Sequence, residues 1–150
     1  MRRAALYDLG ICLFVHAYAL TEAGFWIASE PAARLRSESS DEDVGRALQG
    51  VLSRDLPLRA TPSRRDYLDI GDPVLKSAGL SSWTELQRRA RMCDLERSSD
   101  KVRLIPMRNE RSDGVRAFYH DEERSVEADY SDAKMLGAAA RSALARAAVV

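Results

Sequence analysis

Two stretches near opposite ends of the chain carry the same amphipathic helical pattern. SSDEDVGRALQGVLS occupies residues 39–53, and SDAKMLGAAARSALA occupies residues 131–145. When Gly45 is aligned with Gly137, the apolar residues of both stretches recur at i, i+4, i+7 and i+8, the spacing of one helix face. These faces consist of Val44, Leu48, Val51 and Leu52 in the first stretch and of Leu136, Ala140, Ala143 and Leu144 in the second. We predict a helix in each stretch.

The two predicted helices also share their first residues and an internal glycine. Each begins at a Ser-Asp pair, Ser40-Asp41 or Ser131-Asp132. Either residue type can cap the free N–H groups of a first turn, and a carboxylate there suits the helix dipole. A glycine inside a helix costs about 1 kcal/mol relative to alanine. Its recurrence favours close backbone packing, for example against a sheet.

Extended segments precede both helices in the same order. ICLFVHAY (11–18) is followed by a turn at 21–24 and a second strand at 25–28, and KVRLIPMR (101–108) is followed by NERSDG and a strand at 114–119. Each half therefore reads strand, turn, strand, polar stretch, helix. This shared order predicts a diverged internal repeat. The alternative is that two unrelated amphipathic helices happen to share a common type of cap.

The apolar run from Leu9 to Leu20 also resembles a secretory signal peptide. Two arginines precede it, and Ala17-Tyr18-Ala19 has the small-residue pattern of a cleavage site. Asp8 before the run and His16 within it argue against this reading. Glu22 interrupts the run before the roughly 20 apolar residues that a transmembrane helix needs. The repeat favours a strand that stays in the folded domain.

A helical segment connects the two halves. Pro57 and Pro62 mark a surface loop, after which Asp72-Pro73 begins one short helix that Gly79 ends. Ser82 and Glu85 form a capping box for a second helix, from Trp83 to about Met92. We predict a single α+β domain over residues 1–150, in which antiparallel β-hairpins form a sheet with helices packed on it. Its two diverged strand–strand–helix halves span 1–54 and 93–150, and the helical bridge spans 55–92.

The composition is that of an ordinary soluble domain. The 150 residues are 45% hydrophobic and 31% charged, and 23 basic side chains balance 23 acidic ones. This balance gives no global field that would favour nucleic acid or an anionic membrane. Cys12 and Cys93 are too few for a disulfide framework and predict two buried thiols in a reducing compartment.

The middle and C-terminal segments resemble the immunity proteins of bacterial contact-dependent growth inhibition systems. The resemblance lies in YLDIGDPVLKSAGLSSWTELQRRA, IPMRN and the closing SD…LGAAARSAL helix, and it covers most of residues 39–146. The residues that carry it are Gly71, Asp72, Pro73, Leu75, Lys76, Ser82, Trp83, Pro106, Arg108, Asn109, Gly137, Ala143 and Leu144.

The resemblance implies a small cytoplasmic protein without catalytic activity or cofactor. Its partner would be the toxin domain that a neighbouring cell delivers, commonly a nuclease acting on tRNA or other RNA, whose active site it would block. No direct contact with nucleic acid or membrane is expected.

The polar residues just ahead of the last helix are the candidate toxin-binding site. They are Tyr119, His120, Asp121, Glu122, Glu123, Glu127 and Asp129. A nuclease cleft is basic because it holds phosphates, so an acidic surface can imitate nucleic acid and accelerate association. The plainer alternative is a solvated loop between a strand and a helix. Tyr67 and Tyr130 are further interface candidates, whereas Trp26 and Trp83 are expected in the core.

Two other functions stay open. Arg88, Arg89 and Arg91 on one helix face would suit an RNA- or nucleotide-binding module, although such a face is more commonly only solvated. His120 with Asp121 and Glu123 would suit a metal-assisted enzyme. The sequence contains no Cys-x-x-Cys, His-x-x-x-His, Gly-rich phosphate loop or G-x-S-x-G motif, which argues against an enzyme.

Overall fold

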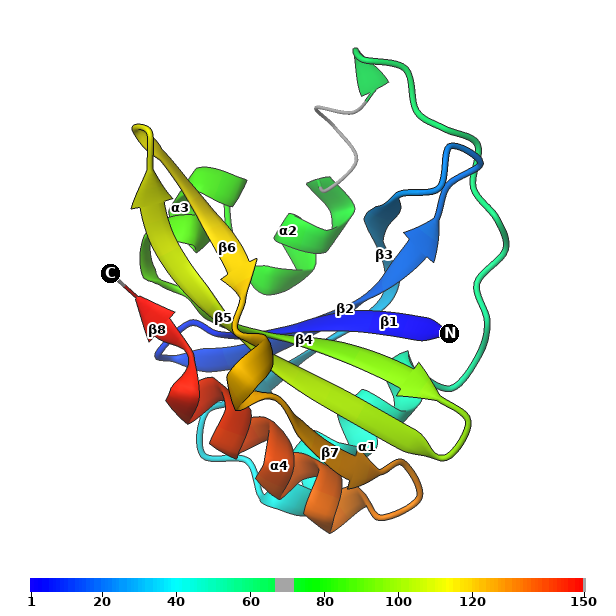
Figure 1. Ribbon diagram of the computed structural model, residues 1–150, viewed down its shortest axis with the longest axis vertical. Helices are drawn as coiled ribbons and strands as arrows, with labels where there is room; N and C mark the ends of the chain where they lie inside the picture. The colour runs from blue at the N-terminus through cyan, green and yellow to red at the C-terminus, as the bar shows by residue number, and fades with distance from the viewer. Residues whose placement is uncertain (67–71, 150) are drawn as a thin grey trace.

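A computed structural model describes residues 1–66 and 72–149 and shows three layers (Figure 1). An eight-stranded sheet lies in the middle, with α1 (Asp41–Val51) and α4 (Ala133–Arg146) on one face. The short helices α2 (Asp72–Ala78) and α3 (Trp83–Arg89) cover part of the other face. The predicted α+β class, an antiparallel sheet with packed helices, is confirmed.

The strands follow the order β3-β2-β1-β4-β5-β6, with β7 and β8 also paired to β5. All pairs are antiparallel except that of β5 with β8. The bounds are β1 (Arg2–Asp8), β2 (Cys12–Leu20), β3 (Trp26–Arg36), β4 (Arg91–Ser98), β5 (Lys101–Ser112), β6 (Val115–His120), β7 (Val126–Asp129) and β8 (Ala148–Val149). A 3₁₀ turn, η2 (Glu122–Arg124), connects β6 to β7.

The strand order is symmetric about the central pair of β1 and β4. On each side of this pair a three-stranded meander runs outward, and a helix follows later in the chain. This arrangement agrees with the internal repeat that the sequence predicts, but each unit has one strand more than expected. The missed strand of the first unit is β1, whose residues Ala4–Tyr7 are all buried. A strand buried on both faces lacks the polar–apolar alternation by which strands are recognised.

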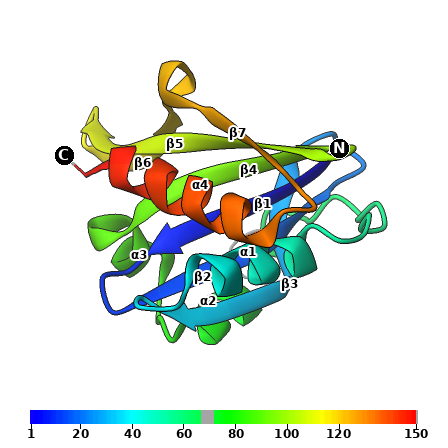
Figure 2. The ribbon, with the colours of Figure 1, turned by 90° about the horizontal axis from the view of Figure 1, so that it is seen from below.

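The helices α1 and α4 pack directly against each other (Figure 2). Both glycines lie at their contact. A Cβ atom added to Gly45 would lie 1.6 Å from the backbone oxygen of Ala133, and one added to Gly137 would lie 1.7 Å from that of Asp41. Each glycine therefore meets the residue four positions before the other glycine. The predicted close packing is confirmed, but its partner is the second helix and not the sheet.

Alternate residues of the central strands supply two separate cores. Leu6, Val15 and Leu95 face α1 and α4, whereas Tyr7 and Phe14 face α2 and α3. Both cysteines are buried and free, with Cys12 in the second core and Cys93 in the first. The apolar run proposed as an alternative signal peptide forms β2, which lies between β1 and β3.

The second strand of the first half is longer than predicted. The expected strand at 25–28 and the polar stretch after it are replaced by β3, which continues to Arg36. The pairing skips Glu30 and Pro31, because Ala17 pairs with Ser29 and His16 with Ala32. Proline has no N–H for a ladder and is tolerated at such bulges and on edge strands. A bulge around a proline therefore concealed the continuation of the strand.

The segment after the acidic run is also a strand rather than the expected loop. β7 pairs with the first part of β5, and Val126 and Ala128 pack against the core that faces α1 and α4. Both predicted helix caps are confirmed. The Ser40 side chain caps α1 by accepting from the N–H of Asp43, and the Asp132 side chain caps α4 by accepting from the N–H of Met135.

The second bridge helix begins as predicted but ends early. The Ser82 hydroxyl accepts from the N–H of Glu85, while the Glu85 carboxylate reaches back one residue further than a capping box requires, to Ser81. Because α3 ends at Arg89 and Arg91 begins β4, the three arginines do not form one helix face, and that prediction is wrong. Tyr67 and Gly71 lie outside the described residues.

Candidate functional site

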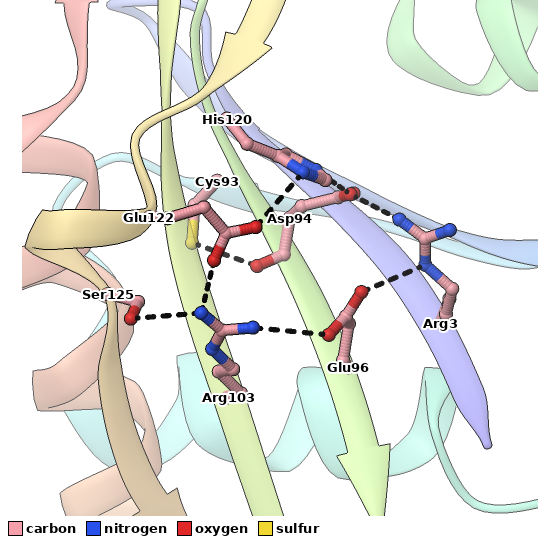
Figure 3. Close-up of polar contacts among 8 residues, drawn as sticks. All are labelled: Arg3, Cys93, Asp94, Glu96, Arg103, His120, Glu122 and Ser125. Atoms are coloured by element: carbon pink, nitrogen blue, oxygen red, sulfur yellow. Dashed lines mark hydrogen bonds and ion pairs between the residues drawn. The ribbon is translucent and has the colours of Figure 1, made fainter.

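Six ionisable side chains form a closed ring on the sheet face that also carries α2 and α3. They are Arg3 of β1, Asp94 and Glu96 of β4, Arg103 of β5, His120 at the end of β6 and Glu122 of η2 (Figure 3). We call these six residues the polar ring. They meet because alternate residues of neighbouring strands point to the same face.

The contacts of the polar ring centre on Asp94. Its Oδ2 accepts from Nη2 of Arg3 at 2.7 Å and lies 2.8 Å from Nε2 of His120. Nδ1 of His120 lies 3.5 Å from Oε1 of Glu122, and the other oxygen of the same carboxylate forms an ion pair with Arg103. Glu96 closes the ring, at 3.9 Å from Arg103 and 3.6 Å from Arg3.

Asp94 is the most buried member of the polar ring. It is 3% exposed, and burying a carboxylate is unfavourable unless it is paired and hydrogen-bonded. Arg3 and His120 satisfy Oδ2, whereas Oδ1 accepts no hydrogen bond from the described residues. Leaving such an atom unsatisfied costs about 1–3 kcal/mol. The ring therefore holds its central carboxylate with one oxygen still unused.

The charge state of the ring depends on His120. The hydrogen bond to Asp94 raises the pKa of His120 above its ordinary value, with further help from the charges of Asp94 and Glu122. Three carboxylates face two guanidinium groups, so the ring carries one excess negative charge when His120 is neutral and none when it is protonated.

Four of the seven predicted site residues lie on this sheet face. His120 and Glu122 belong to the polar ring, and the register places Glu127 opposite Arg103 and Asp129 opposite Lys101. Lys101 forms an ion pair with Asp129. The predicted acidic run is thus interleaved with basic side chains of the same chain.

Of the other three predicted residues, one points to the opposite face and two line a hollow beside the polar ring. Tyr119 is opposite Arg108 on the far face of the β5–β6 hairpin, because neighbouring residues of a strand face opposite ways. Asp121 pairs with Arg124 at 3.5 Å, and both Asp121 and Glu123 line a hollow of about 440 Å³ together with His120 and Glu122 of the polar ring. The structure therefore separates the aromatic candidate Tyr119 from the histidine beside it.

Sequence reasoning missed Arg3, Asp94, Glu96 and Arg103. A signal for two of them exists in β4, where Asp94 and Glu96 alternate with the buried apolar residues Cys93 and Leu95. The same face also carries Trp26, which lies at the sheet surface rather than in the core, with the guanidinium of Arg3 5.4 Å from its ring centre. Trp83 packs against the second core, as expected.

Two further observations concern metal-binding groups and membrane-spanning helices. Within residues 1–66 and 72–149, no group of three His, Cys, Asp or Glu side chains is arranged to hold a metal ion. Over the same part of the chain, no helix is long and apolar enough to cross a membrane.

Comparison with solved structures shows that the fold is a known one. A protein of unknown function from Neisseria meningitidis matches with a TM-score of 0.73 and 15% identity, covering 97% of this chain and 94% of the other. The CdiA-CT/CdiI toxin and immunity complex from Yersinia pseudotuberculosis contains a chain that matches with a TM-score of 0.72 and 18% identity, covering 97% of both chains. At these identities the likeness concerns the fold. No curated protein matches the sequence.

A family model describes nearly the whole chain. The model of the CDI immunity protein, CdiI, matches residues 15–147, a range that includes most of β2, the strands β3 to β7, the bridge and the closing helix. The resemblance found in the sequence is therefore confirmed, and the chain belongs to the CDI immunity protein family.

Proposed function

We propose that this protein binds the toxin domain of a contact-dependent growth inhibition system and neutralises it in the recipient cytoplasm. The observation that carries the proposal is the family match over residues 15–147. The shared fold with a chain of the CdiA-CT/CdiI complex supports it. Inhibition by binding requires no catalytic group and no cofactor.

We further propose that the toxin is a nuclease acting on tRNA or other RNA. Support comes from the carboxylates gathered at one end of the sheet, where Glu122, Glu123 and Glu127 are exposed. Exposed carboxylates complement the basic cleft in which a nuclease holds phosphates. The basic partners within the ring restrict this surface to a local patch rather than a uniformly acidic face.

Binding to the toxin domain encoded by the neighbouring gene tests the proposed function directly. The purified domain and this protein should form a complex that co-elutes in size-exclusion chromatography, and cells producing both should survive. Absence of a complex, or death of cells that contain both proteins, would contradict the proposal. The activity of the purified toxin on tRNA, with and without this protein, tests the nuclease assignment separately.

Charge reversal tests the role of the carboxylates. Glu123→Lys with Glu127→Lys should lower the association rate about tenfold at low salt, because steering charges act mainly on association. Glu22→Lys, a single reversal at the exposed turn before β3, is the control for an acidic residue elsewhere and should leave the rate unchanged. Equal rates for all three proteins would place the interface elsewhere.

A further inference from the structure

A hollow of about 300 Å³ opens between α3 and the sheet, beside the polar ring. Aromatic rings dominate its lining, which includes Tyr7, Tyr18, Trp83, Phe118, Gln87 and Asp94. Tyr7 and Asp94 are buried in its floor, whereas Trp83 and Phe118 are half-buried at its rim. We call it the aromatic pocket.

Asp94 brings a carboxylate, paired with Arg3, to the lining of the aromatic pocket. Among the described residues that line it, Asp94 is the only carboxylate. Both of its protein donors use Oδ2, which leaves Oδ1 without a hydrogen bond in the described part of the chain. Burial and the charge of Asp94 raise the pKa values of Tyr7 and Tyr18, which places the carboxylate near these phenols.

The histidine in the pocket adds no opposing charge. His16 is fully buried, and burial lowers its pKa to about 4. Its Nδ1 lies 2.8 Å from the carbonyl oxygen of Ala17, and its Nε2 lies 3.3 Å from the Tyr7 hydroxyl. A neutral ring that donates from Nδ1 and accepts at Nε2 satisfies both contacts, so the floor of the pocket stays free of positive charge.

The aromatic walls suit a flat cation. Ring faces carry negative potential and attract guanidinium groups within about 6 Å. The protein already shows this contact next to the pocket, where the guanidinium of Arg3 lies 5.8 Å from the ring centre of Tyr18. A guanidinium also presents several N–H donors, and one of them is enough to give Oδ1 of Asp94 the hydrogen bond that it lacks.

We propose that the aromatic pocket binds an arginine side chain of the toxin domain, with Asp94 as the hydrogen-bond acceptor and the aromatic rings as its walls. This inference rests on the proposed function for the identity of the partner. It names the chemistry that the partner presents and makes Asp94 and Phe118 specificity-determining residues.

The pocket can be tested without the toxin. n-Propylguanidinium, a model of the arginine side chain, should shift the NMR signals of Trp83 and Phe118 saturably, while n-propylurea, a neutral molecule of similar shape, should not. Asp94→Asn should weaken n-propylguanidinium binding at least tenfold. The proposal is overturned if neither probe binds saturably, or if both probes bind equally well.

The complex provides the second test. Phe118→Leu removes a ring face but keeps an apolar side chain, and it should raise the dissociation rate of the toxin domain about tenfold. Asp94→Asn should do at least as much, with thermal melting used to confirm that both variants fold. Phe25→Leu, the same change at an exposed phenylalanine that does not line the pocket, is the control and should behave as the original protein. Unchanged dissociation for folded Phe118→Leu and Asp94→Asn would overturn the pocket while leaving the proposed function intact. If the original protein binds no toxin domain, the proposed function fails, and the n-propylguanidinium titration still decides whether the pocket takes a guanidinium.

Discussion

The two histidines of this protein occupy opposite electrostatic environments on the same sheet face. His16 lies among aromatic rings, and its burial outweighs the hydrogen bond to Ala17 and the charge of Asp94 and lowers its pKa to about 4. His120 is partly exposed between Asp94 and Glu122, which raise its pKa. Near neutral pH, therefore, His16 is neutral and His120 retains more proton than an isolated histidine. The two residues give stability opposite dependences on pH.

The titration of His120 should reveal its bond to Asp94. In the folded protein its pKa should exceed 6.5, and Asp94→Asn should lower it, because the main cause of the increase is removed. The protonated form stabilises the fold, so this contribution is complete below pH 6.5 and disappears as the pH rises through the folded pKa. NMR of the imidazole C–H signals measures the change. A His120 pKa that is the same in both proteins would show that the pair does not form in solution.

His16 should destabilise the protein in mild acid. Between pH 6.5 and about 4 the unfolded state binds a proton that the folded state excludes, so the free energy of unfolding falls as the pH is lowered. At pH 5 this loss amounts to about 2 kcal/mol relative to pH 7. Urea unfolding at several pH values measures it, and His16→Gln, which cannot titrate, serves as the reference. The prediction fails if the two proteins lose the same stability between pH 7 and pH 5.

At the scale of elements, the contact between α1 and α4 makes the sharpest prediction. Gly45→Ala should lower the free energy of unfolding by about 2–3 kcal/mol, because its Cβ would meet the backbone of α4, which cannot rotate away. Gly50→Ala is a control in the same helix, where an added Cβ meets nothing within 4 Å. It should stabilise the protein by up to about 1 kcal/mol through helix propensity. Chemical denaturation measures both, and a similar effect of the two variants would contradict the packing described here.

The elements that could be predicted are those with local signals. α1 and α4 have capping residues and a regular apolar face, and β5 and β6 are joined by a polar turn. The elements that were missed depend on distant contacts. β1 is recognisable only once β2 and β4 cover its edges, and β7 is only four residues long and exists because β5 offers it a partner.

At the scale of the whole molecule, stability should be greatest along the central axis of the sheet. β1 and β4 are paired on both sides, and residues Ala4–Leu6 and Cys93–Leu95 are fully or nearly fully buried. We expect their amides to exchange with solvent only through global unfolding, whereas the outer part of β6 near Val115 should exchange through local opening. Native-state hydrogen exchange in low denaturant distinguishes these classes. Equal protection of β6 and β1 would contradict this order.

The residues of the candidate site likewise fall into those with a local sequence signal and those that only distant contacts bring together. His120 and Glu122 were found because they stand in a visible run of polar residues. Arg3 and Asp94 could not be found because they are 91 positions apart, and only the register of β1 against β4 brings them together. A ring that crosses the boundary between the two sequence halves leaves only a weak pattern within each half, such as the alternation of Asp94 and Glu96 with apolar residues in β4.

The paired glycine contacts between α1 and α4 also have a mechanical consequence. One contact would set only the distance between the helices, but two contacts on different turns also set their offset along the axis and their crossing angle. If α4 slid along α1 by one residue, side chains would replace both glycines at the contacts. This layer is therefore a rigid base beneath the sheet. Adjustment to a bound partner then falls to the opposite layer, where α2 and α3 are short and the polar ring is joined by side chains alone.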